Sequence, residues 1–207
     1  MKIALAVSVF ILSCGSAAAQ SSGWYGGVNV AASRLGMAGN DINGALGNQG
    51  IANASTTLHT TDKAAGVEIG YRMSDHLAVE GAYEYLGSFK YDSTAGAATI
   101  SGKYKARAAS LAALGIVPFT PNWSFYAKGG LHYNTVDLNA SSSSAAVPVS
   151  GKSESRAGWL AGLGIRYDFD NGVYTRAGWE HYAKLGQNGA TGATAIDLLQ
   201  VAVGMKF

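Results

Sequence analysis

The feature that most constrains this chain is a two-residue alternation of large apolar side chains with small or polar ones. It recurs along the sequence, whereas the period of an amphipathic helix is nearly absent. A two-residue period indicates β-strands that have one face in an apolar environment. Each segment is about 10 to 13 residues long, which suits tilted strands that cross a membrane. The eight segments are residues 24–33, 64–73, 77–86, 107–118, 123–133, 157–167, 173–183 and 195–207.

The connections between these segments alternate in length. The short ones hold turn residues such as Asp, Pro-Asn and Asn-Gly, and the long ones are rich in Gly, Ala, Ser, Asn and Thr. Outer-membrane barrels have short turns at one end and long loops at the other. We therefore predict an all-β fold, an eight-stranded antiparallel up-and-down transmembrane β-barrel. The short connections are residues 74–76, 119–122 and 168–172, and the long ones are residues 34–63, 87–106, 134–156 and 184–194.

Charged residues share one face of the strands, where they alternate with Gly and Ala, and we expect this face to line the lumen. A basic residue moved to the lipid face at mid-bilayer would cost about 2–4 kcal/mol, so the two faces cannot exchange. Because eight strands leave room only for side chains, we expect a packed polar core. The predicted lumen network is Glu68, Arg72, Glu80, Glu84, Lys128, His132, Arg166, Arg176 and Glu180, with Lys206 on the same face.

The opposite face carries aliphatic side chains and large aromatic rings, which we expect to contact lipid. The rings gather near the ends of the strands, as they do in the aromatic girdles of membrane proteins. Segment 107–118 is apolar on both faces, so its register stays open. The expected girdles are Trp123, Phe125, Tyr167 and Phe207 at the turn end and Tyr85, Tyr133, Trp159 and Trp179 at the loop end.

The first twenty residues have the organisation of a secretory signal. Lys2 precedes an apolar run over residues 3–12, and small residues follow. The run is too short to span a bilayer as a helix. We predict a cleaved signal peptide over residues 1–19 and a barrel domain over residues 20–207. The only cysteine, Cys14, lies in this leader, and lipidation there is the less favoured interpretation because the preceding residues fit a lipobox poorly.

Composition narrows the possible chemistry. Charged residues make up 14% of the chain, against about 25% in ordinary soluble domains, and the formal net charge is +2. A nearly neutral chain argues against nucleic acid as a partner. Loss of the leader would also remove the only thiol, and with it any disulfide or thiolate metal site. The histidines lie in separate segments without metal-ligand spacing, so we expect no catalytic, cofactor or metal site. They are His59, His76, His132 and His181.

Two other functions stay open. The charged face could line a narrow channel for ions or small solutes, although a salt-bridged plug is the plainer interpretation. His181 falls on the lipid-facing side and could be the base of a lipid A-modifying enzyme, although a histidine at headgroup level is simpler. Such an enzyme would need a serine and an orienting acid nearby. The candidates in the preceding loop are Ser153, Glu154 and Ser155.

Three stretches carry a family resemblance. They are WYGGVNVAAS at residues 24–33, GWLAGLGIRYDFDNGVYTRAGWEHY at 158–182, and the closing VAVGMKF at 201–207. Together with the export signal and the eight strands, they resemble the small outer-membrane barrel family. That family includes the transmembrane domain of OmpA, OmpX and the opacity-type surface proteins.

The resemblance implies a non-enzymatic protein of a Gram-negative outer membrane, in contact with lipid and lipopolysaccharide. Its four loops would lie outside the cell and support membrane integrity, adhesion or contact with host surface molecules. It also implies that the last strand carries a signal read by the barrel-assembly machinery. The residues of that signal are Val201, Val203, Met205 and Phe207.

Overall fold

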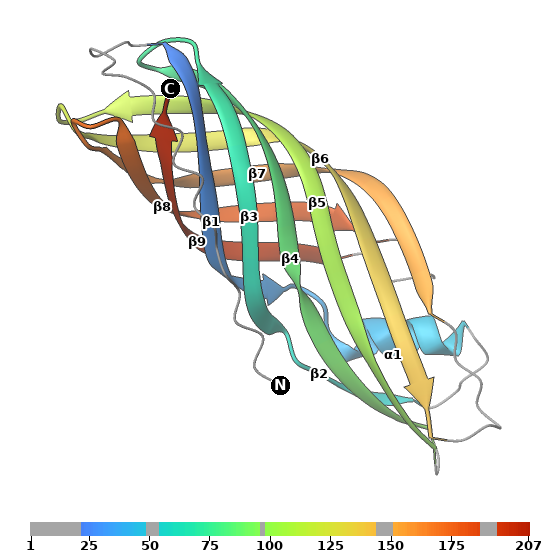
Figure 1. Ribbon diagram of the computed structural model, residues 1–207. Coiled ribbons are helices and arrows are strands. Elements are labelled where there is room, and N and C mark those ends of the chain that lie inside the picture. Colours follow the sequence, from blue (N-terminus) through green and yellow to red (C-terminus); the bar gives the residue numbers. More distant parts are fainter. Residues whose placement is uncertain (1–21, 49–53, 96–97, 144–150, 187–193) are drawn as a thin grey trace.

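The computed structural model describes residues 22–48, 54–95, 98–143, 151–186 and 194–207 (Figure 1). Nine strands and one short helix account for most of them. In chain order they are β1 (Gly23–Leu35), α1 (Gly39–Gly47), β2 (Ser55–Leu58), β3 (Thr61–Arg72), β4 (Leu77–Ala95), β5 (Ala98–Pro118), β6 (Trp123–Ser142), β7 (Lys152–Asp168), β8 (Val173–Leu185) and β9 (Thr194–Lys206).

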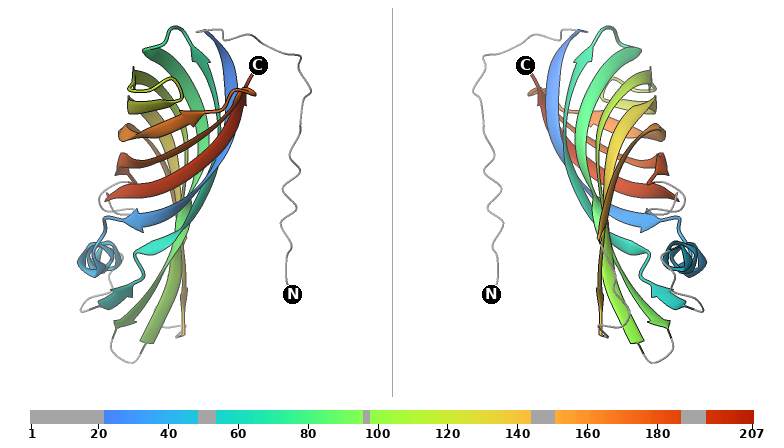
Figure 2. Two further views of the ribbon diagram at one scale, coloured as in Figure 1. Left: turned by 90° about the vertical axis from the view of Figure 1, so that its left-hand side faces the viewer. Right: turned by 90° about the vertical axis from the view of Figure 1, so that its right-hand side faces the viewer.

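Eight of the strands close into a ring in which each pairs antiparallel with its neighbours (Figures 1 and 2). The first and last strands seal it, with Tyr25 of β1 opposite Lys206 of β9. Pairing of β4 with β5 completes the circuit, because β3 and β4 are already neighbours. The short β2 lies outside the ring and pairs only with the far end of β4. The predicted eight-stranded antiparallel up-and-down barrel is confirmed.

The barrel is apolar outside and polar inside. Leu131, Leu199 and Leu111 are 70%, 69% and 63% exposed, whereas Glu80 and Arg176 are 1% and 3% exposed. A closed barrel satisfies its backbone hydrogen bonds internally, so an apolar belt on its outside suits a hydrocarbon environment.

Aromatic rings gather on the outer surface near the turns. The Trp123 ring lies 4.9 Å from that of Tyr167, and the Phe119 ring lies 4.5 Å from that of Phe125. This clustering at one end of the strands is the arrangement of an interfacial girdle.

The register of β5, which the sequence left open, follows from its burial pattern. Leu111 and Val117 face outward and are exposed, whereas Leu114 and Ile116 face inward and are buried. Both faces are apolar because the inward pair packs against other apolar side chains near the turns, among them Tyr126.

The loops predicted over residues 87–106 and 134–156 were wrong for most of their length. β4, β5 and β6 have 19, 21 and 20 residues and continue far beyond the predicted strand ends. Beyond the barrel their polarity is inverted: Phe89 and Tyr104 are buried on the inner face, while Lys90 and Lys103 are exposed on the outer face. The alternation therefore continues, but it now suits water outside and an apolar core inside. We call this part of β4, β5 and β6 the extension.

The extension has its own hydrophobic core. Helix α1 and strand β2, which lie in the predicted loop 34–63, sit on one side of it (Figure 2). Leu58 packs against the buried side chains, which include Met37, Phe89 and Ile100. Burial raises the pKa of Tyr91, which lies in the extension beyond the membrane, to about 12. None of the described helices is long and apolar enough to cross a membrane.

A β-bulge marks the start of the extension in β4. The register shifts between Tyr85 and Gly87, and Gly87 has φ +126°, a conformation that other residues rarely adopt. Because the bulge adds one residue, Tyr85 and Lys90 both face outward although they are an odd number of residues apart.

The lipid-facing belt can be tested with arginine on one strand. Leu163→Arg should lower the free energy of unfolding by about 2–4 kcal/mol, because it puts a cation against acyl chains. Ser155→Arg, on the same face of β7 but in its exposed outer part, should have little effect. The measurement is urea unfolding of vesicle-embedded protein. Equal losses in both variants would contradict the assignment of the belt.

Candidate functional site

The centre of the lumen holds a buried network of ion pairs around Glu80 of β4. The Arg176 guanidinium of β8 donates to both Glu80 oxygens, at 2.7 and 3.0 Å, and also to Glu68 of β3. Lys128 Nζ of β6 lies 3.0 Å from Glu80 Oε1 and 2.7 Å from Glu180 Oε1. All five side chains are buried, and they connect opposite walls of the barrel.

Hydroxyl and amide groups complete the network. The Tyr25 hydroxyl donates to Glu80 Oε2 at 2.9 Å, and the Tyr174 hydroxyl donates to Glu68 Oε1 at 2.7 Å. Gln200 Nε2 donates to Glu180 Oε1 at 2.7 Å. Buried charges are tolerated only when they are paired and hydrogen-bonded in this way.

Glu84 lies in the same layer but is bonded differently. Its Oε1 accepts from Asn29 Nδ2 at 2.6 Å, and no described cation pairs with it. The carboxylate lies directly over Gly66, where a Cβ atom would collide with it. A glycine is therefore required at this position for Glu84 to reach Asn29.

A second charged cluster lies at the turn end. Asp168 Oδ1 lies 2.9 Å from both Arg166 Nη2 and Lys206 Nζ. Arg166 also stacks on the Tyr174 ring, with 3.8 Å between its Cζ and the ring centroid. Such a cation–π contact is favourable away from water.

Arg72 was predicted to belong to the lumen network, but its contacts lie at the turn end of the barrel. Its guanidinium donates to the backbone carbonyls of Ser74 and Asp75 in the first turn, and it lies 3.8 Å from Asp168 Oδ2. It sits at the rim because β3 ends there.

The charges are separated along the barrel axis. The central layer has four acids, Glu68, Glu80, Glu84 and Glu180, against two bases, Lys128 and Arg176. At the turn end Asp168 has three basic partners, Arg72, Arg166 and Lys206. Acids therefore outnumber bases in the central layer, and bases outnumber the acid in the cluster around Asp168.

Apolar clusters lie on both sides of the central layer. On the turn side they include Ala78, Leu114 and Ile116. On the loop side they include Leu160 and Leu198 and continue into the core of the extension. The packed polar core thus occupies the central layer, and it is bounded by apolar side chains because the inner faces of β5 and of the extended strands are apolar.

The sequence of this barrel matches a known family. The model of the OmpA-like transmembrane domain matches residues 19–207. The chain belongs to the OmpA-like transmembrane domain family. It is accordingly an outer-membrane β-barrel. No curated protein matches the chain.

Three solved structures show the likeness in fold. Neisserial surface protein A has a TM-score of 0.58 at 16% identity, and the match covers 91% of this chain and 100% of that one. OprG of Pseudomonas aeruginosa has a TM-score of 0.56 at 16% identity, covering 89% and 96%. The N-terminal barrel of Pseudomonas aeruginosa OprF has a TM-score of 0.51 at 15% identity, covering 91% and 98%. At these identities the likeness concerns the fold.

In this OmpA-like barrel, His132 lies at the loop-side edge of the central layer. Its Nε2 lies 2.8 Å from the Ala183 carbonyl oxygen, and its ring centroid lies 5.3 Å from that of Tyr182. The contact joins β6 to the end of β8.

The residues of the enzyme hypothesis are not brought together. His181 Nδ1 lies 2.8 Å from Asp197 Oδ1, and its ring lies 5.4 Å from that of Trp159 on the outer surface. Ser153 donates to Asp137, and Ser155 bonds Thr135, so both serines are engaged on the exposed part of β6 and β7. Within the described ranges, no group of three or more His, Cys, Asp or Glu could hold a metal ion.

Sequence reasoning missed several members of the lumen. Asn29 and Gln200 are polar residues on the inner face of β1 and β9, so the alternation of those strands could have identified them. Asp168 was placed in a turn, although it is the last residue of β7. Tyr25 and Tyr174 could not be recognised, because an aromatic ring suits the girdle as well as the lumen.

The energetic importance of the central layer can be tested by removing its guanidinium. Arg176→Met should lower the free energy of unfolding by about 3–5 kcal/mol, because Glu68 and Glu80 stay buried but lose their ion pairs with the guanidinium. Arg107→Met is the matched control, since the Arg107–Asp137 pair at 3.3 Å is exposed and should contribute at most about 1 kcal/mol. Urea unfolding in vesicles measures both. Similar losses would mean that water reaches the central layer.

Proposed function

We propose that this protein is a non-enzymatic outer-membrane barrel that presents a folded surface platform and supports membrane integrity, adhesion or host contact. The observation that carries the proposal is the extension, in which β4, β5 and β6 continue beyond the membrane as a hydrogen-bonded sheet. Helix α1 lies on one side of it (Figure 2) and strand β2 pairs with the edge of β4, so the other side faces the surroundings of the cell.

The filled lumen supports a structural role over transport. Ion pairs bridge the centre of the barrel, and apolar clusters pack on both sides of them. An eight-stranded barrel has no further space for a channel once its side chains are packed.

The export signal and the assembly signal stay predictions. Residues 1–21, which include the predicted signal peptide over residues 1–19, lie outside the described residues. Val201 and Val203 face outward on β9 and are exposed, and Met205 shares their side of the strand. We propose that this outward row, together with Phe207, is what the barrel-assembly machinery recognises.

Shortening the extension tests the surface role. Phe89 and Tyr104 are opposite each other, so residues 90–103 can be replaced by a two-residue Asn-Gly turn. The shortened protein should still show heat-modified mobility on denaturing gels, because the barrel strands are untouched. Bacteria that display it should bind cultured host cells or matrix-coated surfaces less well than bacteria that display the full protein. Equal binding, with equal sensitivity to detergent, would contradict the proposal.

Recordings in planar bilayers test the channel alternative. The intact protein should give no reproducible conductance steps, because described side chains fill the lumen. Steps that disappear with Glu80→Ala would replace our proposal with a channel function. Lys105→Ala, on the outer face of the extension, is the control for a change in charge outside the lumen.

A further inference from the structure

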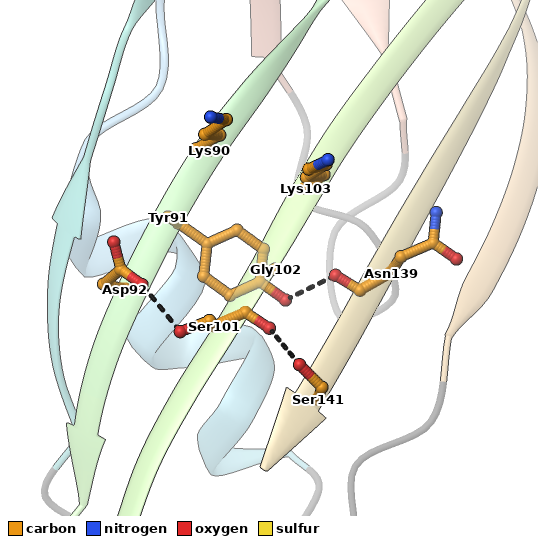
Figure 3. A pocket seen from close by; sticks show the side chains of 8 residues that line it. All are labelled: Lys90, Tyr91, Asp92, Ser101, Gly102, Lys103, Asn139 and Ser141. Carbon is orange, nitrogen blue, oxygen red and sulfur yellow. Dashed lines mark hydrogen bonds between the residues drawn. The ribbon is translucent and has the colours of Figure 1, made fainter. Parts of the chain in front are cut away.

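The outer face of the extension contains a hollow of about 420 Å³ where β4, β5 and β6 lie side by side (Figure 3). Two lysines on neighbouring strands, Lys90 of β4 and Lys103 of β5, border it. Its lining is completed by Tyr91, Asp92, Ser101, Gly102, Asn139 and Ser141.

The two lysines form an unfavourable pair. Lys90 and Lys103 are directly opposite each other in the β4–β5 register. Like charges at directly opposite positions destabilise a sheet. No described carboxylate lies within ion-pair distance of Lys90, Lys103 or the next outward lysine, Lys105. The three ammonium groups therefore form no ion pair with a described carboxylate, although Asp92 lines the same hollow and Asp137 is opposite Lys105.

The nearby carboxylates have other partners. Asp92 accepts a hydrogen bond from Ser101 at 2.7 Å. Asp137 lies 3.3 Å from Arg107 and accepts from Ser153 at 2.6 Å. Both acids therefore have partners other than the lysines, and the outer face of β4, β5 and β6 carries Lys90, Lys103, Lys105 and Arg107 against Asp92 and Asp137.

The floor of the hollow is polar and firmly supported. Ser141 donates to the Ser101 carbonyl at 3.2 Å, and Tyr91 donates to the Asn139 carbonyl at 3.2 Å from beneath the sheet (Figure 3). Gly102 allows this second bond, because a Cβ there would collide with the Tyr91 ring. Hydroxyl and amide groups on a fixed floor suit the hydroxyl groups of a saccharide.

A second hollow of about 310 Å³ adjoins the first and shares Asn139 with it. Lys105 and Asp137, which are directly opposite each other on β5 and β6, are among its lining residues. The two hollows form a trough that is bordered by Lys90, Lys103 and Lys105. A trough of this kind suits a linear ligand that carries repeated negative groups.

The height of the trough argues against the membrane's own headgroups. Lys90 lies five residues beyond Tyr85, and Lys103 lies eight residues beyond Leu111, the outermost large apolar residues of β4 and β5 that face outward. With a strand rise of about 3.3 Å and a tilt of about 40°, Lys90 stands about 12 Å above the level of Tyr85, and Lys103, which is directly opposite Lys90, stands at the same height. Interfacial rings such as Tyr85 sit at headgroup level, so the trough lies above the lipid phosphates.

We propose that this trough binds an anionic polysaccharide from outside the cell, with its negatively charged groups on Lys90, Lys103 and Lys105 and its hydroxyl groups on the floor. The inference rests on the proposed surface function and names the chemical class of its partner.

Binding of dextran sulfate by the purified protein in phosphatidylcholine nanodiscs tests this proposal, with uncharged dextran as the blank. Lys90→Gln/Lys103→Gln should weaken binding about ten-fold or more and reduce the slope of log affinity against log salt by about two. The matched control, Lys63→Gln/Lys184→Gln, removes two exposed lysines elsewhere and should stay within about two-fold of the unmodified protein. Heat-modified mobility confirms that each variant is folded.

Three outcomes would overturn the proposal. Failure of the unmodified protein to bind dextran sulfate at low salt is the first, and equal weakening by both double variants is the second. The third is loss of dextran sulfate binding when the nanodiscs contain lipopolysaccharide, which would assign the lysines to the phosphates of the surrounding lipid. None of these outcomes bears on the cell-binding experiment, so failure here is distinguishable from failure of the proposed function.

Discussion

The structure depends on backbone closure inside a membrane. Hydrocarbon offers no hydrogen-bond partners, so every strand must pair on both sides, and the seal between β1 and β9 is as necessary as any hairpin. Closure fixes which side chains face the lumen, because neighbours in a strand point to opposite faces. The two-residue period of the sequence is therefore a direct record of the two environments. A shift of one residue would put Glu80 in lipid and Val79 in the lumen.

Closure also creates the lumen, in which charged side chains are buried away from water at a cost in free energy. Many polar and charged side chains are buried together there. Buried charges are tolerated only when each acid lies beside a base or a hydrogen-bond donor. Arg176 and Lys128 share Glu80, and each also pairs with a second acid, Glu68 for Arg176 and Glu180 for Lys128. Arg72, Arg166 and Lys206 belong to a different cluster because they lie at the turn end, where Asp168 is their shared partner. The Tyr174 hydroxyl satisfies Glu68 Oε1, and the Tyr25 hydroxyl shares Glu80 Oε2 with Arg176.

How much the sequence predicts follows from this physics. The strands in the membrane could be predicted, because only one face of each tolerates charge. The charged lumen residues were recognisable for the same reason. Tyr25 and Tyr174 were not, since a tyrosine suits both an interface and a hydrogen-bonded core. The extension was mistaken for loops because it is rich in Gly, Ser and Ala, although residues such as Phe89 and Ile100 keep the period of two. Composition outweighed periodicity there, and periodicity was the better guide.

The inversion of polarity along β4 and β5 connects the fold to its surface role. Below Gly87 the outward residues are apolar and the lumen is charged; above it the outward residues include Lys90 and Lys103, and the interior holds Phe89 and Tyr104. The same strands thus cross from hydrocarbon into water without a break in pairing. The extension is stabilised by its own buried core, so its outer face is free to carry lysines that oppose each other. The repulsion between Lys90 and Lys103 does not help the sheet to fold, but the buried core of the extension can tolerate it. A ligand of opposite charge would relieve this repulsion.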